Sequence, residues 1–146
     1  MVMENRIATT IGQSKKLIEL GIDVNTADMF YADIIVNNNH KYNLHPIESY
    51  GFKTFSETKT KESKHLSFIP AWSLTALLEL IPPYLGEFKD EIDFGFSKAI
   101  NGKWYSAYYI KLNDNGLASF NKTVTGDTAI DAAFEMICWL KENKKI

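Results

Sequence analysis

The fold is decided by the stretch IDFGFSKAINGKWYSAYYIKL, residues 92–112. Apolar and polar side chains alternate along both halves of this stretch, which is the pattern of two β-strands that each bury one face. Between the halves lies Asn101-Gly102, a dipeptide typical of the turn of a β-hairpin. The stretch therefore predicts two antiparallel strands, and residues 117–124 predict a third strand that continues the meander.

The register of this hairpin follows from which side chains must share a face. A two-residue turn would pair Phe94 with Tyr109, and the apolar faces of the two strands would then point to opposite sides of the sheet. A three-residue loop over residues 100–102 pairs Phe94 with Tyr108 and puts both apolar faces on the same side. We therefore predict a β-bulge in which Gly102 takes the left-handed conformation that glycine tolerates.

This register gives the sheet a second, mixed face that carries two tyrosines. Tyr105 and Tyr109 lie there beside small and polar residues, among them Gly95 and Ala107. Tyrosines occur on solvated sheet faces because of their strand propensity alone. They also supply contact area and hydroxyl groups to a binding platform. Both interpretations stay open at this point.

Helices and a second hairpin are predicted around the meander. Thr10 and Gln13 form a capping-box pattern, and Gly21 ends the helix that follows with the pattern of a Schellman motif. Alternation over residues 30–36 and a return strand over 42–44 predict the second hairpin. Two further helices are expected, over residues 70–81 and 128–143.

The order of elements is therefore α, ββ, α, βββ, α. We predict an α+β fold in which helices pack on one face of a mostly antiparallel sheet. The length of 146 residues predicts a single domain over 1–146, and the Lys-, Glu-, Ser- and Thr-rich residues 53–66 predict a mobile loop within it. The predicted core comprises Leu17, Leu74, Leu78, Phe94, Ile110, Phe120, Ile130, Phe134, Ile137 and Leu140.

The composition excludes several classes of protein. The chain has 16 Lys and Arg against 18 Asp and Glu, so it lacks the strongly basic balance of a protein that binds nucleic acid over its whole surface. A single cysteine excludes an internal disulfide framework. No apolar run approaches the roughly 18 residues of a transmembrane helix, and the first residues lack the apolar core of a signal peptide. We therefore expect a cytoplasmic protein that does not associate with membranes.

The sequence contains no catalytic constellation. His40, His45 and His65 have no cluster of cysteines or carboxylates around them, so we expect no metal site. Cys138 shares its side of the last helix with carboxylates, which disfavour the reactive thiolate. We expect neither a cofactor nor an enzymatic activity.

Aromatic residues supply the candidate functional surface. Trp72 and Glu79 lie together on the otherwise polar side of the helix predicted over 70–81, and Trp139 flanks the polar stripe of the last helix. Each of these indoles is either covered by a neighbouring element or exposed as an anchor for a partner. The candidate protein-interaction surface comprises Trp72, Glu79, Tyr105, Tyr109 and Trp139.

Three stretches of the chain together resemble a group of small proteins that recur in gut anaerobic bacteria. They are IATTIGQSKKLIELGIDVNTADM at 7–29, IPAWSLTALLELIP at 69–82 and DAAFEMICWLKENKK at 131–145, roughly a third of the chain. Genes of this group often lie on mobile or phage-derived DNA, and the group has no known activity, cofactor or catalytic residue. The resemblance implies a cytoplasmic accessory protein and carries no mechanism.

Three classes of function follow from these observations. A protein-binding or self-associating module ranks first, because aromatic residues are enriched at interfaces. A nucleic-acid-binding module is the alternative, since lysines at 15–16, in residues 53–66 and at 144–145 would form a basic patch if they clustered. An enzyme ranks last. We expect a non-catalytic accessory protein of a mobile element or phage, whose partner is a second copy of itself or another protein.

Overall fold

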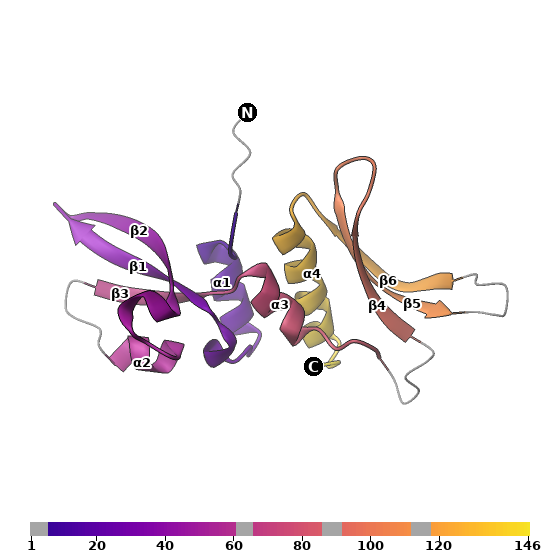
Figure 1. The fold of residues 1–146 in the computed structure, drawn as a ribbon, viewed down its shortest axis with the longest axis horizontal. Helices are drawn as coiled ribbons and strands as arrows, with labels where there is room; N and C mark the ends of the chain where they lie inside the picture. The colour runs from indigo at the N-terminus through magenta and orange to yellow at the C-terminus, as the bar shows by residue number, and fades with distance from the viewer. Residues whose placement is uncertain (1–5, 61–65, 86–91, 112–117) are drawn as a thin grey trace. The chain divides into compact units, whose positions relative to one another are not determined.

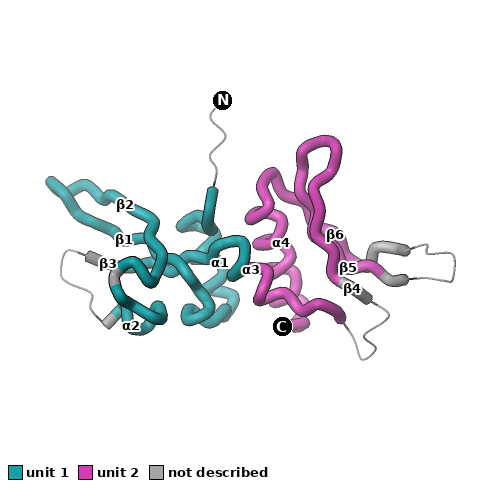
Figure 2. Tube along the Cα trace, in the orientation of Figure 1, with its two compact units in different colours: residues 1–76 teal, residues 77–146 magenta. Residues whose placement is uncertain are grey.

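The computed structural model describes residues 6–60, 66–85, 92–111 and 118–146. These residues form a mixed α+β fold with antiparallel sheets, as predicted (Figure 1). They divide into two compact units, unit 1 (residues 1–76) and unit 2 (residues 77–146), which Figure 2 colours separately. Each unit has its own three-stranded sheet, where we had expected one sheet. The single domain over 1–146 stays a prediction.

The elements follow one another along the chain in a simple order. Those of residues 1–76 are helix α1 (Ile11–Glu19), the 3-10 turn η1 (Val24–Thr26), strands β1 (Met29–Val36) and β2 (Asn39–Pro46), the 3-10 turn η2 (Ile47–Tyr50), helix α2 (Phe55–Thr60) and strand β3 (Leu66–Ala71). Helix α3 (Leu74–Leu80) runs from the end of unit 1 into unit 2. Strands β4 (Ile92–Lys98), β5 (Trp104–Lys111) and β6 (Ala118–Gly126) and helix α4 (Ala129–Glu142) complete the chain.

Both ends of α1 are capped as predicted. The Thr10 hydroxyl accepts from the Gln13 N–H at 3.1 Å, and the Thr10 N–H donates to the Gln13 side chain at 3.0 Å. At the other end Gly21 has a φ of 89°, and the Ile22 N–H donates to the Leu17 carbonyl at 3.0 Å. The capping box and the Schellman motif are therefore confirmed.

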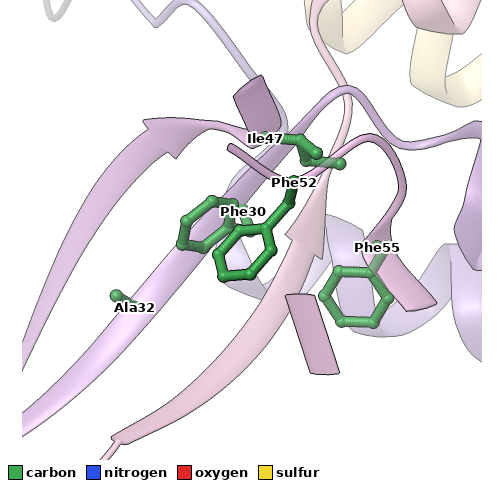
Figure 3. Close-up of a cluster of buried hydrophobic side chains, with 5 residues drawn as sticks. All are labelled: Phe30, Ala32, Ile47, Phe52 and Phe55. Atoms are coloured by element: carbon green, nitrogen blue, oxygen red, sulfur yellow. The ribbon is translucent and has the colours of Figure 1, made fainter. Parts of the chain in front are cut away.

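The sheet of unit 1 has the strand order β2-β1-β3. One face of β1 packs on η2 and α2 through the buried side chains of Phe30, Ala32, Ile47, Phe52 and Phe55 (Figure 3). The loop predicted over 53–66 is therefore wrong over residues 55–60, which form α2. The Thr54 hydroxyl accepts from the Glu57 N–H at 3.3 Å at the start of this helix, and Phe55 anchors it in the core. Residues 61–65 lie outside the described part of the chain.

The helix predicted over 70–81 begins later than expected. Pro70 belongs to β3, an edge strand of the sheet, where proline is tolerated. Helix α3 begins only after Ser73, whose hydroxyl accepts from the Ala76 N–H at 3.2 Å. The Ser73 N–H in turn donates to the Asp28 carboxylate at 2.8 Å. A contact between residues 45 positions apart therefore sets the start of this helix.

The bulged hairpin of unit 2 is confirmed. Phe94 lies opposite Tyr108, and Gly102 has a φ of 83°. The Gly102 N–H donates to the Ala99 carbonyl at 2.9 Å, and the Ala99 N–H donates to the Lys103 carbonyl at 2.8 Å. These two bonds enclose the three-residue loop, and the left-handed glycine corrects the register as predicted.

Helix α4 packs on one face of the sheet β4-β5-β6. The Ser106 hydroxyl donates to the Ala132 carbonyl at 2.7 Å, and the Thr128 hydroxyl caps the helix by accepting from the Asp131 N–H at 3.1 Å. Of the predicted core, Leu17, Ile130, Phe134, Ile137 and Leu140 are buried, and Leu74, Leu78 and Phe94 are half-buried. The side chains of Ile110 and Phe120 lie outside those that the structure describes.

Candidate functional site

The two faces of the unit 2 sheet differ in what covers them. Ser106 and Tyr108 point toward α4, because the Ser106 hydroxyl bonds to that helix and the Tyr108 ring lies 6.5 Å from the Trp139 ring. Successive side chains of a strand point to opposite faces. Tyr105 and Tyr109 therefore lie on the opposite face, which we call the outer face, as the predicted register requires.

A groove of about 460 Å³ lies on the outer face between the two tyrosines. Ala107 forms its floor on β5 and is itself buried, although it lies on the face opposite α4. Thr123 pairs with Ala107 across β5 and β6 and lines one side of the groove. Ser97 lines the other side, opposite Tyr105 on the neighbouring strand. The tyrosine rings are thus the walls of a small concave site with a floor made by a short side chain.

Gly95 is the second small residue of the floor. A Cβ atom at this position would lie 2.9 Å from Cε1 of Tyr109, so the Tyr109 ring rests directly over the glycine. A side chain at position 95 would push this ring away. The other wall is held by Asn101, whose side-chain amide lies 3.4 Å from the Tyr105 hydroxyl oxygen. The sequence placed these residues on one face, and the close packing of ring on glycine is what makes the face concave.

The remaining members of the candidate surface do not join the two tyrosines. Trp72 precedes α3 and has an exposed fraction of 0%, so it does not share a helix face with Glu79. Its indole N–H donates to the Thr26 hydroxyl at 2.9 Å, which confirms the interpretation of a covered indole. Glu79 is exposed on α3.

Trp139 lies on the side of the sheet that carries α4. Its ring is 6.5 Å from that of Tyr108, and the Lys122 ammonium lies 5.7 Å from its centroid. Because Tyr108 points away from the outer face, the structure separates Trp139 from the groove.

The groove offers a particular chemistry. Its described lining consists of aromatic rings, hydroxyl groups and small residues, and it includes no Lys, Arg, Asp or Glu. Such a site suits an apolar side chain with neutral polar groups beside it. Across the described residues, no group of three His, Cys, Asp or Glu side chains is placed to hold a metal ion.

Tyr108, on the helix side of the same strand, holds the sheet in place. Its buried hydroxyl donates to the Pro82 carbonyl at 2.6 Å, and burial raises the pKa of Tyr108 well above its usual value. Burial also raises the pKa of Tyr31, although the positive charge of Arg6 opposes the shift. Both shifts favour the neutral phenol in the folded protein.

Alkaline pH should therefore unfold the protein partly through Tyr108. Its folded pKa lies above the value of about 10 for an unfolded tyrosine, so its contribution is complete below pH about 10 and is lost as the pH rises toward the folded pKa. We expect Tyr108→Phe to lower the free energy of unfolding by about 1 kcal/mol near neutral pH. Above pH about 10 the free energy should fall less steeply in the variant. Urea titrations at several pH values measure both effects. If the free energy of unfolding fell equally steeply with pH above about 10 in both proteins, the result would contradict this account.

Comparison with protein-family models, with curated proteins and with solved structures finds no match for the chain. Among the described residues, no helix is long and apolar enough to cross a membrane. The groove on the outer face is therefore the feature from which a function can be proposed.

Proposed function

We propose that this protein is a non-catalytic protein-interaction module that binds a partner protein through the groove between Tyr105 and Tyr109. The groove is the observation on which this proposal rests. Tyrosines are enriched among the residues that contribute most of the binding energy at protein interfaces. Such residues cluster in well-packed pockets. Each ring supplies a large contact area at a low cost in conformational entropy, because only two side-chain torsions become fixed.

The aromatic rings and hydroxyl groups of the described lining favour a protein as the ligand. Binding to nucleic acid draws most of its affinity from lysines and arginines at phosphates. The lysine–aromatic pairs of this sheet lie on the helix side, where Lys98 is 5.9 Å from the Trp104 ring centroid and Lys122 is 5.7 Å from that of Trp139. These pairs are a candidate site for the alternative function, nucleic-acid binding.

The resemblance to proteins encoded on mobile or phage-derived DNA supports a biological setting for the module. In this setting the protein would act in the cytoplasm as an accessory protein of such an element, by binding other proteins and without a cofactor. We propose this setting together with the groove, and the experiment below tests the groove alone.

A photo-crosslinking amino acid at Thr123 tests the proposal. Thr123 is exposed at the side of the groove, so a benzophenone side chain placed there reaches whatever fills the site. In the native host we expect light-dependent adducts with protein that survive nuclease treatment. In the background of Tyr105→Ala with Tyr109→Ala, we expect these adducts to fall about 30-fold, as for the loss of an interface hot spot.

Trp104→Ala is the matched control, because it removes an aromatic ring from the opposite face of the same strand. This variant should crosslink as the unsubstituted protein does, provided that circular dichroism shows it to be folded. Adducts that nuclease digestion removes would favour the alternative function. Adducts that persist in the double-tyrosine variant would refute the groove as the binding site.

A further inference from the structure

The groove of the outer face has a row of three residues across the strands between its two tyrosines. Gly95 pairs with Ala107 and Ala107 pairs with Thr123, so the row crosses β4, β5 and β6. Tyr105 and Tyr109 lie on β5 on either side of the row, each two residues from Ala107. Neighbouring strands of a sheet lie about 4.8 Å apart. The row is therefore two strand spacings, or about 9.6 Å, long.

The floor of the groove is a backbone that is already paired. β5 is the middle strand of the sheet, and it pairs with β4 on one side and with β6 on the other. The N–H and C=O groups of a sheet lie in its plane, so a chain that lies over the face cannot join the ladder. A buried N–H without a partner costs the free energy of its desolvation. The groove therefore favours an occupant with few N–H groups, and proline is the residue that has none.

The lining supplies hydrogen-bond donors for the carbonyl groups of such an occupant. Ser97 on β4 and Thr123 on β6 are exposed, and each carries a hydroxyl group. The Tyr105 oxygen accepts from the Asn101 amide at 3.4 Å, so the hydrogen of this hydroxyl remains to donate. A run of prolines has only carbonyl acceptors in its backbone. The donors of the groove and the acceptors of a proline-rich segment are therefore complementary.

The length of the row fits one backbone conformation. A polyproline II helix rises about 3.1 Å per residue with three residues per turn, so residues i and i+3 recur on one side at about 9.3 Å. This spacing matches the distance of about 9.6 Å from Gly95 to Thr123. In a β-strand, residues recur on one side at about 6.8 Å, which is too short. An α-helix uses its carbonyl groups internally, so it would cover the hydroxyl groups without giving them acceptors.

We infer that the partner segment bound in the groove is proline-rich and crosses the three strands as a polyproline II helix. This inference rests on the proposed function and names the chemistry of the segment that the groove takes. The proline rings pack on Tyr105 and Tyr109, and the carbonyl groups accept from Ser97 and Thr123. Such a segment is extended before it binds, so it loses little conformational entropy in an aromatic-lined groove.

A titration with decaproline tests the inference, because this peptide presents proline at every i and i+3 pair. We expect the amide NMR signals of Gly95, Ala107 and Thr123 to shift and to saturate, with a Kd below about 1 mM. A flexible Gly-Ser decapeptide is the control peptide and should bind at least about 10-fold more weakly.

Two variants of the groove and one matched control complete the experiment. Tyr105→Ala with Tyr109→Ala should weaken decaproline binding at least about 10-fold, whereas Trp104→Ala, on the opposite face of β5, should bind normally. Gly95→Ala changes the shape of the groove and keeps both rings. Its Cβ atom would lie 2.9 Å from Cε1 of Tyr109 and displace that ring, so we expect similar weakening in a variant that circular dichroism shows to be folded.

Several outcomes would overturn the inference. One is that the groove signals do not shift at about 5 mM decaproline. Equal binding of the Gly-Ser peptide would show that the groove does not select proline, and tighter binding of a helical Glu-Ala-Ala-Ala-Lys repeat would favour a helical occupant. Normal binding by the folded double-tyrosine variant or by Gly95→Ala would place the proline site elsewhere. If crosslinking from Thr123 to protein still depends on the tyrosines, the inference fails while the proposed function stands. Loss of both results would refute both.

Discussion

Replacing Trp72 with alanine is expected to lower the free energy of unfolding by about 3–5 kcal/mol, the range for removing a large aromatic side chain from a core. The indole has an exposed fraction of 0% and donates to the Thr26 hydroxyl at 2.9 Å. Its backbone is bonded in both directions to Thr9, with the Thr9 N–H at 2.9 Å from the Trp72 carbonyl and the Trp72 N–H at 3.1 Å from the Thr9 hydroxyl. Truncation therefore leaves a cavity beside a fixed backbone. Urea titration followed by circular dichroism measures the loss.

Trp72→Phe separates packing from hydrogen bonding. Phenylalanine keeps an aromatic ring in the site and removes only the bond to Thr26, so we expect a loss smaller than that of the alanine variant. In both variants the remaining tryptophans, Trp104 and Trp139, lie in unit 2, so circular dichroism is the signal that compares the two losses. A loss below about 1 kcal/mol for Trp72→Ala would contradict the burial of the indole.

Gly126→Ala is the second substitution with a large expected effect, and it acts on unit 2. A Cβ atom at this position would lie 2.5 Å from the backbone nitrogen of Ala132 and 2.7 Å from Cβ of Asp131. The clash is with the first turn of α4, so the helix and β6 must move apart. We expect a loss of about 3 kcal/mol, at the upper end of the usual range for overpacking. Urea titration followed by tryptophan fluorescence, to which Trp104 opposite Gly126 contributes, measures it.

Gly12→Ala is the matched control, and we expect it to change the free energy of unfolding in the opposite direction. The nearest atom to a Cβ at position 12 is the Thr10 hydroxyl oxygen at 3.9 Å, an ordinary contact. Gly12 lies inside α1, where alanine is favoured over glycine by up to about 1 kcal/mol. This variant should be as stable as the unsubstituted protein or more stable. If both glycine substitutions lowered the free energy of unfolding equally, the close approach of α4 to β6 would not explain the loss in Gly126→Ala.

The features that the sequence predicted correctly are those governed by neighbouring residues. The capping box of Thr10 and Gln13 and the bulge at Gly102 each depend on a few consecutive positions. The outer face followed from the same reasoning, because strand parity alone places Tyr105 and Tyr109 on one side. Helix α2 also had a local signal, since Thr54 and Glu57 have the spacing of a capping box. Its composition of Lys, Ser and Thr concealed that signal.

The features that the sequence analysis missed depend on distant partners. Pro70 fits the first turn of a helix as well as an edge strand, and only the bond from Ser73 to Asp28 fixes where α3 begins. Trp72 was placed on a helix for the same reason. The concave shape of the groove depends on Tyr109 resting on Gly95 across two strands. The exposure of Ile35 could not be read from its strand, because apolar residues occupy both faces there.

The division of the chain at residue 76 also orders events during synthesis. All three strands of the first sheet precede this position, and all three of the second follow it. Trp72 bonds to Thr9 across 63 residues, so the first core closes only when nearly all of unit 1 has left the ribosome. Unit 1 can therefore complete its sheet and core before any strand of the second sheet has been translated.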